Sequence, residues 1–130
     1  MKLYNIIVKF PENEFQCSCS VNEESIGNKE IGLLTQFHSV NEDNELSTAL
    51  MRLLARFYQF GADYFTNGEL SGEDVARKLE KELGEIWLEN YHFTGVWPHS
   101  VNFGELCYSS DESVDIEVTW KYKNCSIGVK

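Results

Sequence analysis

The stretch that decides the fold is SVDIEVTWKY, residues 113–122, where apolar and polar side chains alternate more regularly than anywhere else in the chain. A period of two predicts a β-strand, because successive side chains of a strand point to opposite faces of a sheet. One apolar and one polar face are typical of an antiparallel sheet with one side in solvent. The predicted buried face carries Val114, Ile116, Val118, Trp120 and Tyr122.

Three stretches in the first third of the chain have similar patterns. LYNIIVKF (residues 3–10) is rich in β-branched side chains, and FQCSCSV (15–21) alternates with a period of two. Together they predict a β-hairpin. IGLLTQF (31–37) is short and apolar and predicts a third strand after the polar loop NEESIGNKE. The predicted buried face of the second strand carries Phe15, Cys17, Cys19 and Val21.

The pattern changes to a helical period after residue 45. From Leu46, apolar residues recur every three or four positions up to Gly61, which predicts a helix with one apolar face. A second helix is predicted for SGEDVARKLEKELGEIWLEN (71–90), beginning at a motif that resembles a capping box. YHFTGVW (91–97) returns to a strand pattern and is predicted to end at Pro98. The predicted buried stripe of the second helix is Val75, Leu79, Leu83, Ile86 and Trp87.

This order of elements predicts an α+β fold, an antiparallel β-sandwich or small barrel with two flanking helices. The 130 residues suit a single domain, residues 1–130. Apolar residues make up 42% of the chain, which excludes a disordered protein. No apolar run approaches the ~20 residues that span a bilayer, and the N-terminus lacks a secretory signal pattern. We therefore expect no membrane partner and, unless the protein is viral, a cytoplasmic location.

The charge is strongly acidic, with 11 Lys and Arg against 21 Asp and Glu and a formal net charge of −10. Binding to phosphates requires an excess of Lys and Arg, so tight nucleic-acid binding is not expected. An acidic surface suits plain solubility, the capping of a basic partner, or a channel past which nucleic acid slides without sticking.

Motifs for chemistry are weak in this sequence. The spacing of Cys17, Cys19, Cys107 and Cys125 does not match zinc-binding pairs, and the first two fit a strand core better. His99 with Cys107 is the one candidate nucleophile and base, but no third orienting group is evident. No P-loop, dinucleotide-binding fingerprint or nucleophile-elbow motif is present. We therefore predict a protein that is not an enzyme, with no catalytic residues, metal or cofactor.

The three tryptophans allow different interpretations. Trp87 and Trp120 fall on apolar stripes and are expected in the core. Trp97 precedes Pro98 and is therefore pushed to an extended conformation. It either anchors a bend or serves as a contact residue at an interface.

The C-terminal part, FTGVWPHSVNFGELCYSSDESVDIEVTWKY (about residues 93–122), resembles the tail tube proteins of T4-like contractile phages. The resemblance consists of a glycine followed by Trp-Pro, a short segment ending in an aromatic and a serine, and an acidic-apolar strand. The positions that match are Gly95, Trp97, Pro98, Val101, Gly104, Leu106, Tyr108, Ser109, Glu117, Val118 and Thr119.

This resemblance implies a structural virion protein, made in the host cytoplasm, whose subunits form rings that stack into a hollow tube for DNA passage. The partner would then be further copies of the same chain, with an acidic lumen that repels DNA. The residues that it implies at an interface between subunits are Trp97, Pro98, Val101, Glu117 and Thr119.

An alternative is an acidic immunity or inhibitor protein that binds and masks a basic nucleic-acid-processing partner. Its small size and its charge of −10 fit this class. It predicts a clustered acidic face, formed either by Glu42, Asp43 and Glu45 or by Asp111, Glu112 and Asp115.

Overall fold

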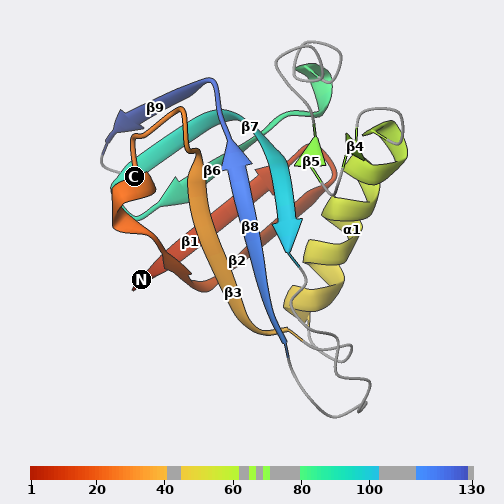
Figure 1. The fold of residues 1–130 in the computed structure, drawn as a ribbon, viewed down its shortest axis with the longest axis horizontal. Coiled ribbons are helices and arrows are strands. Elements are labelled where there is room, and N and C mark those ends of the chain that lie inside the picture. The colour runs from red at the N-terminus through yellow and green to blue at the C-terminus, as the bar shows by residue number, and fades with distance from the viewer. Residues whose placement is uncertain (41–44, 62–64, 67–68, 71–79, 103–113, 129–130) are drawn as a thin grey trace.

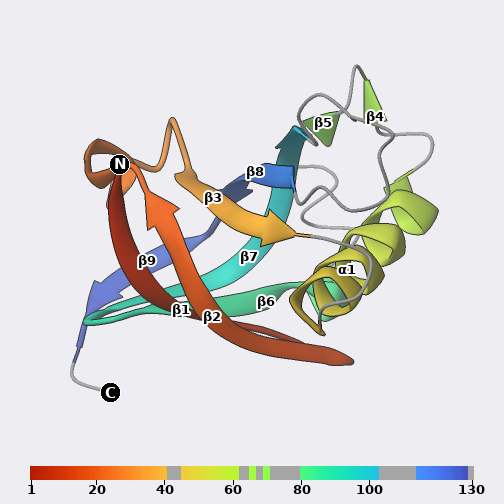
Figure 2. The ribbon, with the colours of Figure 1, turned by 90° about the horizontal axis from the view of Figure 1, so that it is seen from below.

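The computed structural model describes residues 1–40, 45–61, 65–66, 69–70, 80–102 and 114–128. Six strands build its main body: β1 (Lys2–Phe10), β2 (Asn13–Val21), β3 (Leu33–Val40), β6 (Gly84–Leu88), β7 (Tyr91–Asn102) and β8 (Val114–Lys121). They pair in the order β6-β1-β2-β3-β8-β7, and β7 pairs with both β8 and β6, so the sheet closes into a barrel (Figures 1 and 2). Every pairing between described strands is antiparallel, which confirms the predicted small antiparallel barrel.

Shorter elements complete the described part of the chain. They are η1 (Glu23–Ser25), α1 (Glu45–Gly61), β4 (Phe65–Thr66), β5 (Glu69–Leu70), η2 (Glu80–Glu82) and β9 (Asn124–Ile127). The β4–β5 hairpin joins β7 near its C-terminal end, and β9 joins β7 near its start. Only one α-helix occurs among the described residues, so the prediction of two flanking helices is not confirmed.

The first hairpin confirms its predicted strands. β1 pairs with β2 in one register from Lys2↔Val21 to Phe10↔Asn13, around a turn at residues 11–12. Alternate residues face inward, because a strand has a period of two. Cys19 is buried and Cys17 is half-buried on the same face, as the pattern of residues 15–21 predicts.

The predicted helix from Leu46 to Gly61 is confirmed as α1, which lies across the end of the barrel where β1 turns into β2 (Figure 2). The Asn13 side-chain amide donates a hydrogen bond to the Ala49 carbonyl at 2.5 Å. The Phe57 ring meets the Phe10 ring edge-on, with 5.3 Å between centroids. This face of the helix therefore closes one end of the core and buries Leu50, Leu53, Leu54 and Phe57.

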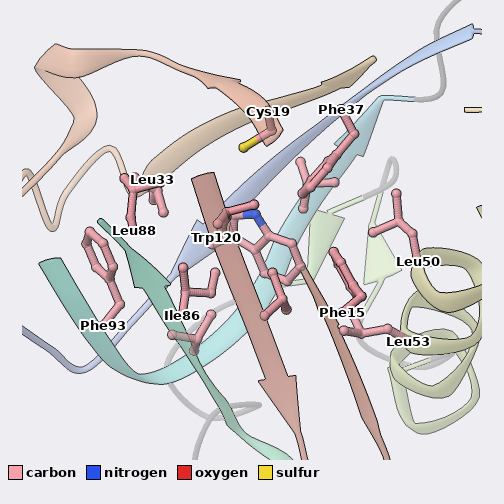
Figure 3. Close-up of a cluster of buried hydrophobic side chains, with 14 of the residues drawn as sticks. Phe15, Cys19, Leu33, Phe37, Leu50, Leu53, Ile86, Leu88, Phe93 and Trp120 are labelled. Carbon is pink, nitrogen blue, oxygen red and sulfur yellow. The ribbon is translucent and has the colours of Figure 1, made fainter. Parts of the chain in front are cut away.

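Trp120 fills the middle of the barrel (Figure 3). Its indole N–H donates to Thr35 Oγ1 at 2.9 Å, and the Thr35 hydroxyl donates in turn to the Val118 carbonyl at 2.9 Å. This satisfies the one polar group of the ring, as burial requires. The placement of Trp120 in the core is confirmed, and residues 114–121 of the predicted strand form β8.

β7 is a long strand that bends twice, and it corrects the expectation that the strand ends at Pro98. Its register with β6 shifts around Gly95, which has φ of +66°, and its register with β8 shifts around His99. Both shifts are β-bulges, which bend a strand and increase its twist. Pro98 lies beside the second bulge, where the ladder is already interrupted, so the strand continues to Asn102.

The second predicted helix is wrong at its C-terminal end. Residues 84–88 form strand β6, with Ile86 and Leu88 inside the barrel and Trp87 on the outer face, where it is only half-buried. A short apolar run fits the period of a helix as well as that of a strand. Here the pairing of β6 with β1 and β7 makes these residues a strand. Residues 71–79, with Val75 and Leu79, lie outside the described residues.

The third strand begins two residues later than predicted, because the preceding loop folds onto the barrel. Gly32 has φ of +86°, and a Cβ atom there would lie 2.7 Å from the Trp120 carbonyl oxygen. The buried Ser25 hydroxyl accepts a hydrogen bond from the Leu34 N–H at 3.0 Å, and Lys121 Nζ donates to the Glu30 carbonyl. These contacts attach residues 22–32 to the ends of β3 and β8.

Candidate functional site on the outer wall of the barrel

The five predicted interface residues lie along the β7–β8 pair, but they differ in accessibility. Trp97 is 8% exposed and Pro98 is buried, so both contribute to the wall of their own barrel. Val101 and Thr119 are half-buried, and Glu117 is exposed. The interface role of these residues stays a prediction.

The outer wall formed by β2, β3, β8 and β7 is polar. The registers place Ser20 opposite Gln36, Gln36 opposite Glu117, and Glu117 opposite Asn102. These four residues form a continuous cross-strand row, because directly opposite residues share a face. Glu117, one of the predicted interface residues, is therefore part of a row that crosses four strands.

A three-residue hydrogen-bonded chain lies beside this row. Ser20 Oγ on β2 is 2.5 Å from His38 Nε2 on β3, and His38 Nδ1 is 3.3 Å from Asp115 Oδ1 on β8. The side chains of His38 and Asp115 are 39% and 50% exposed. A neutral imidazole that carries its proton on Nδ1 donates to the carboxylate and accepts from the serine hydroxyl. The arrangement therefore aims a base at a hydroxyl group in contact with solvent.

The sequence alone does not reveal this hydrogen-bonded chain of Ser20, His38 and Asp115. Its members are separated by 18 residues between Ser20 and His38 and by a further 77 between His38 and Asp115, and no local motif links them. His38 reaches its place because it follows Phe37 on β3 while Asp115 precedes Ile116, the register partner of Phe37, on β8. The strand assignments alone would put Ser20 and Asp115 on outer faces, but only the order of the strands brings the three together.

A second polar cluster lies on the opposite wall, across β1, β6 and β7. The Trp87 and His92 rings stack with centroids 3.7 Å apart and planes at 6°. Glu85 Oε2 lies 3.3 Å from His92 Nε2, and Glu85 Oε1 lies 4.0 Å from Lys9 Nζ. Trp87 is thus half-buried by its neighbours on the outside of the barrel rather than in the core, which corrects its predicted position. His92 lies half-buried on the same outer face.

The end of the barrel opposite α1 exposes several large hydrophobic residues beside charged ones such as Lys2 and Glu23. The N-terminus, η1 and β9 all lie at this end (Figure 1). Leu3 is 61% exposed and Ile127 is 80% exposed. The large hydrophobic residues that are exposed in the described part of the chain are Met1, Leu3, Ile31 and Ile127, and all belong to segments at this end.

The described cysteines do not form a reactive site. Burial raises the pKa of the Cys17 thiol to about 11, and burial together with the neighbouring Cys17 raises the pKa of Cys19 to about 12. Such thiols stay protonated near neutral pH and are poor nucleophiles. His99 is half-buried at the second bulge of β7, whereas Cys107 lies outside the described residues.

The acidic clusters that were predicted fall largely outside the described part of the chain. Glu45 and Asp115 are exposed, whereas Glu42, Asp43, Asp111 and Glu112 belong to segments that the structure does not describe.

Within the described ranges, no three His, Cys, Asp or Glu side chains are grouped so that they could hold a metal ion. No helix in these ranges has the length and apolar character to cross a membrane. Comparison with known proteins gives no assignment, because no protein-family model, curated protein or solved structure matches this chain.

Proposed function

We propose that the protein is a structural subunit that self-associates into rings or a hollow tube for DNA passage. The proposal extends the likeness of residues 93–122 to tail tube proteins of contractile phages. It places the protein in a virion, assembled from chains made in the host cytoplasm. The required interactions are contacts between copies, with no cofactor.

The observation that carries the proposal is the set of exposed hydrophobic residues at the end of the barrel opposite α1. Large exposed hydrophobic groups that gather in one region mark sites of protein association, because water is displaced when they are covered. Leu3 and Ile127 are more than half exposed, although both lie in well-paired strands. Burying them against another copy would therefore stabilise an assembly without rearranging the barrel.

The outer edge of β9 supports the same proposal. The Gly128 N–H donates to the Asn90 carbonyl at 2.8 Å. Because backbone groups of successive strand residues point to alternate sides, this bond shows which residues of β9 face β7. The backbone groups of Cys125 and Ile127 then point away from β7, and no described strand pairs with this edge. An unpaired edge is a template for a strand from another chain. Pairing there would extend the sheet from one subunit to the next.

The predicted interface residues take different parts in this proposal. Trp97 and Pro98 shape the bend of β7 from inside the wall, whereas Val101, Glu117 and Thr119 have surface that a neighbouring copy can contact. A net charge of −10 would keep DNA from adhering to an enclosed channel.

The test is particle size by light scattering over a concentration series, followed by negative-stain microscopy of the largest species. We expect rings or hollow rods whose fraction rises with concentration. Ile127→Asp should shift association to higher concentration, because it places a charge on the apolar end. Gln16→Asp is the matched control, because it adds the same charge at an exposed position on the barrel wall and should leave association unchanged. A monomer at every concentration would refute the proposal.

A second candidate is the acidic immunity or inhibitor protein. It is favoured by the exposed carboxylates of Asp115 and Glu117, which lie on the same outer wall. This function predicts a chain that stays monomeric and binds a basic protein with an affinity that falls steeply as salt is added. Asp115→Asn combined with Glu117→Gln should then weaken that binding.

A further inference from the structure

We propose that Ser20, His38 and Asp115 form an acyl-transfer site on the outer wall of the barrel that hydrolyses small activated esters. The site lies on the outer wall formed by β2, β3 and β8, and Ser20 is opposite Leu3 in the β1–β2 register. The reaction needs only one copy of the chain, so this proposal does not depend on the proposed assembly function.

The geometry matches the requirements of an activated serine. A nucleophile must lie within hydrogen-bond reach of a base, and the base must be oriented by a third group. Ser20 Oγ is 2.5 Å from His38 Nε2, and Asp115 Oδ1 is 3.3 Å from the other ring nitrogen, Nδ1. Asp115 contacts no reacting atom in this arrangement, so it is a positioning residue for the imidazole.

Gln36 is the group best placed to stabilise an oxyanion. It lies directly opposite Ser20 in the β2–β3 register and is half-buried on the same outer face. A side-chain amide can donate to the negative oxygen that forms when a carbonyl is attacked. The charged group in this row is Glu117, which lies opposite Gln36 on β8. Its carboxylate would repel a negatively charged substrate, so we expect a preference for uncharged esters.

The proposed reaction conserves atoms and protons at each step. Ser20 Oγ forms a bond to the acyl carbon while its proton moves to His38 Nε2, and collapse of the tetrahedral intermediate breaks the bond to the alcohol. His38 gives that proton to the departing alkoxide. Water then attacks the acyl-serine, loses a proton to His38, and releases the carboxylic acid as the Ser20 hydroxyl is restored.

The substrate must reach the site from open solvent. Two hollows of about 310 and 500 Å³ are lined by residues other than Ser20, His38 and Asp115. Ser20 and His38 are half-buried and Asp115 is exposed, so the site faces solvent on the barrel wall. We therefore infer a small acyl group, such as an acetyl ester, and a high KM.

Labelling by a fluorophosphonate probe, read by intact mass, tests whether Ser20 is activated. We expect one adduct per chain, on Ser20. Ser18→Ala is the matched control, because Ser18 lies on the same face of β2 but bonds Asn5 at 3.1 Å and not a histidine. Ser20→Ala should abolish the adduct, whereas Ser18→Ala should leave it unchanged. No adduct on the folded wild-type chain, or equal loss in both variants, would overturn the proposal.

Hydrolysis of p-nitrophenyl acetate separates the roles of the other two residues. His38→Ala should lower kcat by about 100-fold, the lower part of the range for a lost general base, and added imidazole should restore part of the rate. Asp115→Asn should lower kcat with KM unchanged, as expected of a residue that orients the base. If imidazole gives no rescue, or if both variants hydrolyse the ester as fast as the wild-type chain, the serine is not activated by this histidine.

Discussion

Thr35 is the residue whose replacement best tests how the barrel core is held together. Its hydroxyl accepts the indole N–H of Trp120 and donates to the Val118 carbonyl, each at 2.9 Å. Thr35 is 2% exposed and Trp120 is fully buried, so water cannot replace a lost hydrogen bond. Thr35→Val keeps the shape of the side chain but removes the hydroxyl, and it leaves the indole N–H without a partner.

Thr35→Val should lower the free energy of unfolding, because a buried donor without a partner costs more than an ordinary hydrogen bond contributes. An unsatisfied buried donor costs about 1–3 kcal/mol, whereas an ordinary hydrogen bond contributes about 1 kcal/mol. We expect a loss near the middle of that range, roughly 2 kcal/mol, because the Val118 carbonyl keeps an accepting position in the β-ladder. Thr35→Ser is the matched control, since it removes a methyl group and keeps both hydrogen bonds. It should cost roughly half as much or less.

Urea unfolding followed by far-ultraviolet circular dichroism measures both variants on the same scale. A double-mutant cycle with Trp120→Phe isolates the pair, because Phe has no N–H to satisfy. In the Trp120→Phe background, Thr35→Val should cost less than it does alone. A Thr35→Val variant within about 0.5 kcal/mol of the wild-type protein, the range of ordinary surface changes, would refute this account of the core.

Three further predictions concern stability. Gly32→Ala should destabilise the protein more than Gly27→Ala. Both glycines have positive φ, but only a Cβ at position 32 would meet a backbone carbonyl, at 2.7 Å. Thermal unfolding compares the two variants, and equal losses of stability would mean that this contact is unimportant. The contribution of Cys17 and Cys19 to stability should be constant below about pH 9 and be lost between pH 9 and 12. Burial raises the pKa of Cys17 to about 11 and of Cys19 to about 12, so the unfolded chain loses these protons first. Urea midpoints across this range test the sign, and Cys19→Ala should flatten the decline. Phe57→Ala should lower the free energy of unfolding by about 3–5 kcal/mol, because a buried ring is lost between α1 and the barrel. A much smaller loss would mean that other contacts hold the helix.

The elements that were predicted correctly are those whose pattern repeats for several periods. β8 alternates over its whole length, and α1 keeps an apolar face for 17 residues, so each pattern fits only one kind of element. β6 has five residues, which is too few to distinguish a strand from the end of a helix. Its identity depends on two neighbouring strands that are remote in sequence.

The path of β7 could not be predicted for a different reason. Pro98 ordinarily ends a central strand, because it cannot donate to the ladder. Here the bulge at His99 shifts the register next to it, and Gly95 supplies the other bend. The position of a bulge depends on the strands paired on both sides, which are remote in sequence. Sequence analysis identified Gly95, Trp97 and Pro98 as an unusual segment but not that the strand continues through it.

The candidate site was even less accessible to sequence reasoning. The strand period alone places Ser20 and Asp115 on outer faces, but which strands are neighbours follows only from the closed topology. β3 lies between β2 and β8, and the register that pairs Phe37 with Ile116 brings the next residue, His38, beside Asp115. Distances between side chains from three strands thus depend on strand order and register together.

The order in which the chain is synthesised gives the closing strand a particular importance. β8 is the last of the six barrel strands along the chain, and it alone joins β3 to β7. The Trp120–Thr35 contact that it brings spans 85 residues, and such distant contacts form late and slowly. Until β8 leaves the ribosome, β3 and β7 each present an unpaired edge and the core lacks its central ring. Such a nascent chain is exposed to aggregation, so slow translation just before β8 would lower the yield of folded protein.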